Sequence, residues 1–235
     1  LINGISFLIS SVSEMFIHVP KSAAEKKTVS FGMVVNDMKE AVLYVRKHSG
    51  LLQMMIGALV LNLFGSGLSS ILYPFLVEKG FSIEEYGYFL SLESAAALAA
   101  VSLLAAIPVR RKKSVIMRVC VALTWSLSLA MILSKGVPWT IGMNTLCTFF
   151  NMIFNSLLNA ALILSIEESM RGKVLGMVIS FSTLGQAASS LMYGWIAESI
   201  GSVHTALVLT LISVVPNILF ICSHTISAVM NEETV

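Results

Sequence analysis

Seven long apolar stretches constrain the fold of this chain more than any other feature. They lie at 1–19, 51–77, 88–109, 115–134, 139–166, 174–197 and 203–226. Each is at least as long as the roughly 17 to 25 residues that an α-helix needs to cross the hydrocarbon core of a bilayer. The sequence therefore predicts an all-α membrane protein that crosses the bilayer several times.

The positions of the basic residues predict the orientation of these spans. Of the 15 Lys and Arg residues, all but Lys79 and Lys135 lie in every second gap between the stretches or just inside the following stretch. These residues are Lys21, Lys26, Lys27, Lys39, Arg46, Lys47, Arg110, Arg111, Lys112, Lys113, Arg118, Arg171 and Lys173. Because basic loops are retained in the cytoplasm, we expect the first helix to enter from outside and the carboxyl terminus to be cytoplasmic.

Composition excludes several other classes of protein. Hydrophobic residues make up 56% of the chain and charged residues 12%, against about 25% charged residues in soluble domains. The net charge of +2 comes from loops that flank the membrane, so it does not predict binding to nucleic acid. Cys120, Cys147 and Cys222 lie within predicted spans without metal-ligand spacing, so we expect no metal site and no cofactor.

The chain divides into four predicted segments. Residues 1–20 form a transmembrane helix, 21–50 a cytoplasmic linker, 51–227 a six-helix bundle and 228–235 a cytoplasmic tail. Within the linker, apolar residues recur at helical spacing from Phe31 to Val45, which predicts an amphipathic helix on the membrane surface. The first residue is already inside an apolar helix, so we expect the chain to be a fragment of a longer protein.

The six spans of the bundle divide into two groups of three. Because three is odd, the second group must be inverted relative to the first, which is an arrangement common in secondary transporters. The basic run at 110–113 in the first group has no counterpart at 198–202 in the second, as inversion requires.

A ladder of polar side chains follows one face of the fifth span. Its members lie within an arc of about 80° at 100° per residue. They are Asn144, Thr148, Asn151, Asn155 and Asn159. Amides are costly against lipid, so the ladder either forms hydrogen bonds between helices or lines an aqueous cavity that a solute crosses. Four amides along about 22 Å of helix favour the cavity.

The second span carries a weaker polar face, formed by Asn62, Ser66 and Tyr73. Gly65 and Gly67 lie beside it and permit the helix to bend where a partner satisfies the backbone.

Two carboxylates lie within predicted spans, and such groups can carry a coupling proton. Glu93 is six residues into the third span, in its outer third, where proton coupling or contact with a substrate is weighed equally with a structural role. Glu14 is near the cytoplasmic end of the first span, where a structural role is the simpler interpretation because its side chain can reach the interface.

Several segments resemble the major facilitator superfamily, in its macrolide-efflux-like and enterobactin-exporter-like bacterial branch. The opening Asn3-Gly-Ile-Ser-Phe-Leu-Ile-Ser is similar to the sixth helix of that branch, and Met38-Lys-Glu-Ala-Val-Leu-Tyr-Val-Arg to its linker. Phe81-Ser-Ile-Glu-Glu-Tyr-Gly-Tyr-Phe-Leu-Ser resembles its entry to the eighth helix. Glu168-Ser-Met-Arg-Gly-Lys-Val-Leu-Gly and Gly194-Trp-Ile-Ala-Glu-Ser-Ile-Gly resemble its tenth-to-eleventh loop and its eleventh helix.

The resemblance implies helices six to twelve of a proton-coupled exporter in a bacterial cytoplasmic membrane. That exporter would move a drug-like or siderophore-like solute by alternating access against a missing amino-terminal half. The Asn62 and Asn144 helices would line its cavity. Arg171 and Gly172 match a cytoplasmic loop of the family. Arg110 and Arg111 keep the basic character of its gating loop, which here lacks the family's Gly and Asp.

A seven-helix receptor and an intramembrane enzyme are the alternatives to a transporter. A seven-helix receptor is compatible with the number of spans, but no Lys lies in the last span to anchor retinal, and the linker is long for that fold. An intramembrane enzyme would need a metal-binding His-Glu-x-x-His motif, paired Asp residues or a Ser with an intramembrane base, and the sequence shows none of these. We therefore expect that the chain is not an enzyme.

Overall fold

The computed structural model describes residues 2–16, 30–107 and 112–223, and the elements in these ranges are helices. The chain divides into two units, Leu1–Asn36 and Asp37–Val235, and each is described by itself. The first unit contains α1 (Ile2–Met15), a helix of 14 residues within the predicted first span. The end of that span, the linker before residue 30, Arg110, Arg111 and the tail at 228–235 lie outside the described residues.

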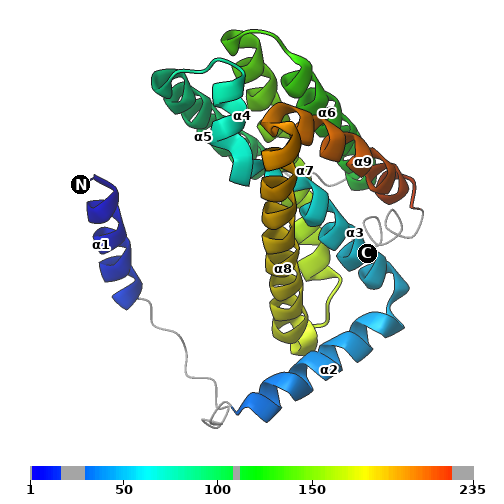
Figure 1. Cartoon of the computed structure of the whole chain (residues 1–235). Coiled ribbons are helices and arrows are strands. Elements are labelled where there is room, and N and C mark those ends of the chain that lie inside the picture. Colours follow the sequence, from blue (N-terminus) through cyan, green and yellow to red (C-terminus); the bar gives the residue numbers. More distant parts are fainter. Residues whose placement is uncertain (1, 17–29, 108–111, 224–235) are drawn as a thin grey trace. The chain divides into compact units, whose positions relative to one another are not determined.

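The remaining helices follow the predicted order along the chain (Figure 1). They are α2 (Phe31–Lys47), α3 (Ser49–Gly65), the 3₁₀-helix η1 (Gly67–Ile71), α4 (Leu72–Glu78), α5 (Ile83–Ala106), α6 (Lys113–Leu133), α7 (Val137–Leu164), α8 (Glu168–Ile200) and α9 (Ser202–Cys222). With α3, η1 and α4 taken as one segment, six helical segments of the described chain are long and apolar enough to cross a membrane. The all-α prediction is thus confirmed for the described residues, and the six helices predicted for the bundle have the length and composition to cross a membrane.

Large apolar side chains remain exposed on the outside of these helices. Leu191 and Trp195 of α8 are 76% and 75% exposed, and Leu98 of α5 is 70% exposed. Soluble monomers rarely expose contiguous apolar surface on this scale, whereas lipid would cover it. The surface therefore fits a multi-pass membrane protein.

Two helices begin well before the apolar stretches that predicted them, whereas the other helices of the bundle begin within two residues of theirs. Ser82 and Glu85 form a capping box, in which Ser82 N donates to Glu85 Oε2 at 2.8 Å, and α5 therefore begins at Ile83 rather than at residue 88. Glu93 is consequently the eleventh of the 24 residues of α5. It lies near the middle of the helix, which corrects the prediction of an outer-third position. α8 likewise begins at Glu168, before its apolar stretch.

The helices of the bundle pack in two groups. α7 packs against α5 and α6, whereas α3 packs against α8 and α9. Contacts between α6 and α9 join the groups. Exchanging α3 with α7, α5 with α8 and α6 with α9 converts these contacts into one another, but the contact between α8 and α9 has no comparable counterpart between α5 and α6.

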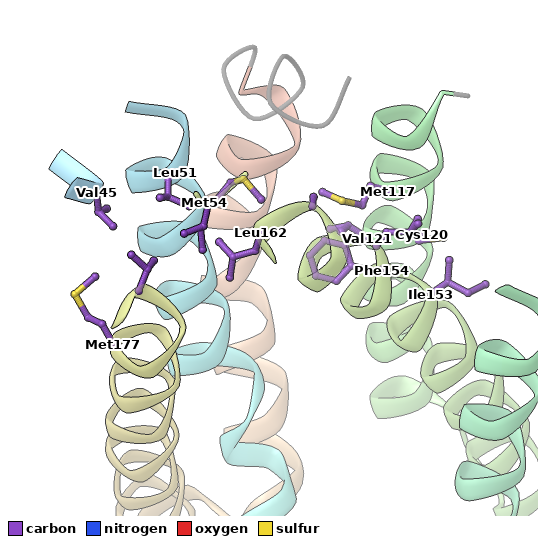
Figure 2. Packing of buried hydrophobic residues seen from close by; sticks show 14 of the residues in the cluster. Val45, Leu51, Met54, Met117, Cys120, Val121, Ile153, Phe154, Leu162 and Met177 are labelled. Carbon is purple, nitrogen blue, oxygen red and sulfur yellow. The ribbon is translucent and has the colours of Figure 1, made fainter. Parts of the chain in front are cut away.

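The main apolar core joins both groups near one end of the bundle. Figure 2 shows Leu51 and Met54 of α3 in one part of this cluster, and Val121 of α6 with Phe154 of α7 in another. Val45 of α2 belongs to the same cluster. These buried contacts fix the positions of the helices that surround the polar interior.

The part of α2 from Asp37 onward is attached to the start of α8. Lys173 Nζ lies 2.8 Å from Asp37 Oδ1 and 2.5 Å from Glu40 Oε2. Tyr44 Oη accepts a hydrogen bond from Glu167 N at 3.2 Å. The amphipathic linker helix predicted from the sequence therefore contacts the bundle as well as presenting an exposed face.

Glu78 and Lys79, at the end of α4, bind the ends of two other helices. Glu78 Oε2 accepts hydrogen bonds from the N–H groups of Ser202 and Val203, at 2.7 and 3.1 Å, at the start of α9. Lys79 Nζ donates to three carbonyl oxygens at the end of α6, at 2.8 to 2.9 Å. A carboxylate at a helix amino terminus and an ammonium at a carboxyl terminus both complement the helix dipole. Partial burial lowers the pKa of Lys79, because desolvation disfavours the ammonium form.

Candidate functional site

A cavity of about 540 Å³, with both polar and apolar residues in its lining, lies between the two groups of helices. Residues of α3, η1, α5, α6, α7, α8 and α9 line it, and Ser66 does so at the junction of α3 and η1. Its polar lining residues are Asn62, Ser66, Glu93, Ser94, Thr124, Ser128, Asn144, Cys147, Thr148, Asn151, Asn155, Tyr193, Thr210 and Asn217. The volume falls within the range of about 300 to 1,000 Å³ that is common for small-molecule sites.

Four of the five ladder residues predicted on α7 lie at this cavity. Asn144, Thr148, Asn151 and Asn155 are half-buried there. Asn159, which the periodicity placed on the same face, is exposed and does not line the cavity.

Glu93 and Asn144 meet across two helices. Asn144 Nδ2 of α7 donates to Glu93 Oε2 of α5 at 3.2 Å, and both residues line the cavity. The sequence marked the two residues separately, and the structure brings them together. The amide orients the carboxylate, so one polar pair connects the ladder to a group that can carry charge.

The next two amides form a bond within their own helix. Asn155 Nδ2 donates to Asn151 Oδ1 at 2.8 Å and to Asn151 O at 3.0 Å. Both of these bonds lie within α7 and do not join neighbouring helices. They therefore give no support to the hypothesis that this part of the ladder exists to hold helices together.

The opposite wall contains Asn62 and Ser66. Asn62 Oδ1 accepts a hydrogen bond of 3.5 Å from Gln186 Nε2 of α8, and Ser66 Oγ donates to Asn62 O at 2.5 Å. Tyr73 lies elsewhere: it is 50% exposed, and its ring packs edge-on against Tyr86. The polar face predicted for this span thus reaches the cavity at Asn62 and Ser66 and does not include Tyr73.

The helix at this wall is interrupted at the glycines. Gly67 begins η1, and a Cβ atom there would lie 2.1 Å from the Tyr193 ring. Tyr193 Oη donates to Phe64 O at 2.7 Å, which satisfies a carbonyl next to the interruption. Glycine therefore allows α8 to approach the interrupted backbone closely.

The sequence reasoning missed the contributions of α6 and α9. Thr124, Trp125 and Ser128 of α6 line the cavity, as do Thr210 and Asn217 of α9. Thr124 with Ser128, and Thr210 with Asn217, have i,i+4 and i,i+7 spacing. The same periodicity that revealed the ladder could have revealed these faces.

Of the remaining predicted site residues, Arg171 and Gly172 do not line this cavity, and Arg110 and Arg111 lie outside the described residues. Glu14 is exposed near the end of α1, in the other unit of the chain. Arg171 and Gly172 lie in the first turns of α8 rather than in a loop, and Arg171 Nη2 donates to Ile166 O at 3.4 Å. Among the described residues, no group of three or more His, Cys, Asp or Glu side chains is placed to hold a metal ion.

Comparisons with protein-family models, with curated proteins and with solved structures give no match to this chain.

Proposed function

We propose that this chain is the carboxyl-terminal part of a secondary active transporter of the major facilitator superfamily. In this proposal, the six-helix bundle moves a solute across a bacterial cytoplasmic membrane by alternating access, together with an amino-terminal half. Efflux is coupled to protons, and the carboxyl terminus is cytoplasmic. The observation that carries the proposal is the cavity, to which α3 and α7 contribute amides and α5 contributes Glu93.

The pairing of the helices supports the proposed arrangement of two inverted triplets. α7 contacts α5 and α6 as α3 contacts α8 and α9, which is what a twofold relation between the triplets requires. The interruption at Gly67 provides further support, because transporter sites are often built beside discontinuous helices.

A receptor or another helical membrane protein without transport activity is the alternative. In such a protein, the amides would serve as hydrogen bonds between helices. The Asn144–Glu93 bond fits that role, whereas the Asn151–Asn155 bond within α7 does not.

Substitution of the ladder distinguishes the two functions. Cells that express the whole protein are first profiled for accumulation of macrolides and siderophores, with and without a proton uncoupler. Asn151→Leu should then reduce export of the responding solute about tenfold, because losing a polar contact of roughly 1.4 kcal/mol changes a rate or affinity by that factor. Expression should stay close to that of the wild type, because leucine has the same branched shape as asparagine and the cavity has room for its larger volume.

Asn159→Leu is the matched control, since it makes the same change on the same helix outside the cavity. We expect near-normal export from this variant. If Asn151→Leu instead lowers the amount of folded protein while export per molecule is normal, the ladder is structural and the proposal fails.

A further inference from the structure

The described lining of the cavity contains one formally charged side chain, and its charge is negative. Among the described residues that line it, Glu93 alone carries a formal charge, and none is Lys, Arg or His. Glu93 accepts a hydrogen bond from the neutral amide of Asn144. A carboxylate within a membrane bundle is costly unless a proton or a cation neutralises it. The cavity therefore favours a positively charged occupant.

Aromatic side chains share the cavity with this carboxylate. Trp125 of α6, Phe154 of α7 and Phe64 of α3 all line it. Aromatic faces attract organic cations and also provide apolar contact area. An inorganic ion would gain little from these rings, whereas a cation with an apolar body would use both features.

Asn217 adds an acceptor on the far side. Its side chain is 3% exposed, and its Nδ2 donates to Ser213 O at 2.7 Å. Its Oδ1 is buried and has no hydrogen-bond partner in the part of the chain that the structure describes. A buried acceptor without a partner is costly. Because protein atoms cover this oxygen, it adds a partial negative charge to the cavity wall and not a direct contact with the solute.

We infer that the cavity binds an organic cation with an apolar, ring-containing body. This inference rests on the proposed function and deepens it, because it chooses between the two solute classes that the sequence left open. A basic, drug-like amine fits the cavity, whereas an anionic siderophore would be repelled by Glu93. A proton and the cation would compete for the same carboxylate.

Binding of two ions of similar shape and opposite charge tests the inference. The whole protein is purified into lipid nanodiscs, and the binding of tetraphenylphosphonium and of tetraphenylborate is measured by equilibrium dialysis, with empty nanodiscs subtracted. We expect the wild type to bind the phosphonium at least about tenfold more tightly than the borate. Equal affinity, or tighter binding of the borate, would overturn the inference.

Two substitutions on α5 then test whether Glu93 is the carboxylate that binds the cation. Glu93→Gln should weaken phosphonium binding about tenfold or more, because it removes the carboxylate and keeps its shape. Glu84→Gln makes the same change at an exposed position in the first turn of the helix and should bind as the wild type does. Unchanged binding in Glu93→Gln also overturns the inference. If that variant does not fold, the comparison of the two ions in the wild type still decides.

The proposed transport function and the inferred cation site can be contradicted independently of each other. Selective phosphonium binding without transport of any solute would support the cation site and contradict the transporter. Uncoupler-sensitive export without any preference for the cation would contradict the cation site and leave the transporter standing.

Discussion

Among the single residues, Glu93 is the one best placed to take part in proton coupling or solute binding. It lies near the middle of α5, receives a hydrogen bond from Asn144 and lines a cavity built from both groups of helices. A carboxylate in this position must be neutralised or well solvated in each state of the protein, because a bare charge within the bilayer is costly. Exchange of its proton is therefore a physical route by which a proton gradient can act on the cavity.

Glu93→Gln should abolish the part of solute export that an uncoupler removes, because glutamine cannot exchange the proton. The measurement is solute accumulation in cells with and without the uncoupler, with Glu84→Gln as the control for loss of one negative charge. Unchanged, uncoupler-sensitive export in Glu93→Gln would show that coupling resides elsewhere, with Glu14 the next candidate.

The site residues show how far periodicity can predict. The constant 100° step of an uninterrupted α-helix brought Asn144, Asn151 and Asn155 to the cavity, but Asn159 lies at the edge of the arc and is exposed. Tyr73 does not reach the cavity for a different reason: the 3₁₀-helix η1 lies between it and Asn62. A 3₁₀ segment turns 120° per residue, so five residues shift the face by about 100° relative to an α-helix.

At the scale of elements, hydropathy predicted the six spans of the bundle but not where they end. Caps set the ends: the Ser82–Glu85 box begins α5, and Glu78 receives the first N–H groups of α9. The Ser82–Glu85 box is a local Ser-x-x-Glu pattern that the sequence could have revealed. The Glu78 contact joins residues distant in sequence, so no local pattern reveals it. The close approach of Gly201 to Glu78 is part of this contact, since a Cβ there would lie 3.0 Å from Glu78 Oε1.

Lys79→Met should destabilise the bundle by about 1 to 3 kcal/mol, because three carbonyl oxygens at the end of α6 lose a charged donor. In a chain of this size each kcal/mol corresponds to about 2 to 4 °C in the unfolding midpoint. Thermal unfolding of the purified protein in detergent measures the effect. Lys135→Met removes the same charge from a neighbouring exposed position and should change the midpoint little. Equal midpoints for the two variants would show that the Lys79 contacts contribute nothing.

At the scale of the whole molecule, the helices of the bundle present an apolar exterior and enclose a cavity lined in part by polar side chains. The sequence predicted both the apolar spans and the polar ladder. It could not predict that α6 and α9 complete the cavity, because that depends on which helices become neighbours. The exchange of contacts between the two groups is likewise absent from the residues themselves, where no repeat is visible, and emerges only from packing.

The central claim, that the ladder faces water in a solute pathway, is tested most directly by thiol labelling. Cys120, Cys147 and Cys222 are first replaced, and single cysteines are then introduced into the whole protein in intact cells. Lys135→Cys serves as the control expected outside, and Lys112→Cys as the control expected in the cytoplasm, reactive only after permeabilisation. Both positions are exposed.

With these controls, a membrane-impermeant methanethiosulfonate reagent is applied to Asn151→Cys in the cavity and to Leu146→Cys on the outer face of α7. We predict that Asn151→Cys is labelled, from outside or after permeabilisation, and that Leu146→Cys is not, because water reaches the cavity but not the lipid-facing surface. If Asn151→Cys reacts only after denaturation, the ladder is packed between helices and the account of a solute pathway is contradicted.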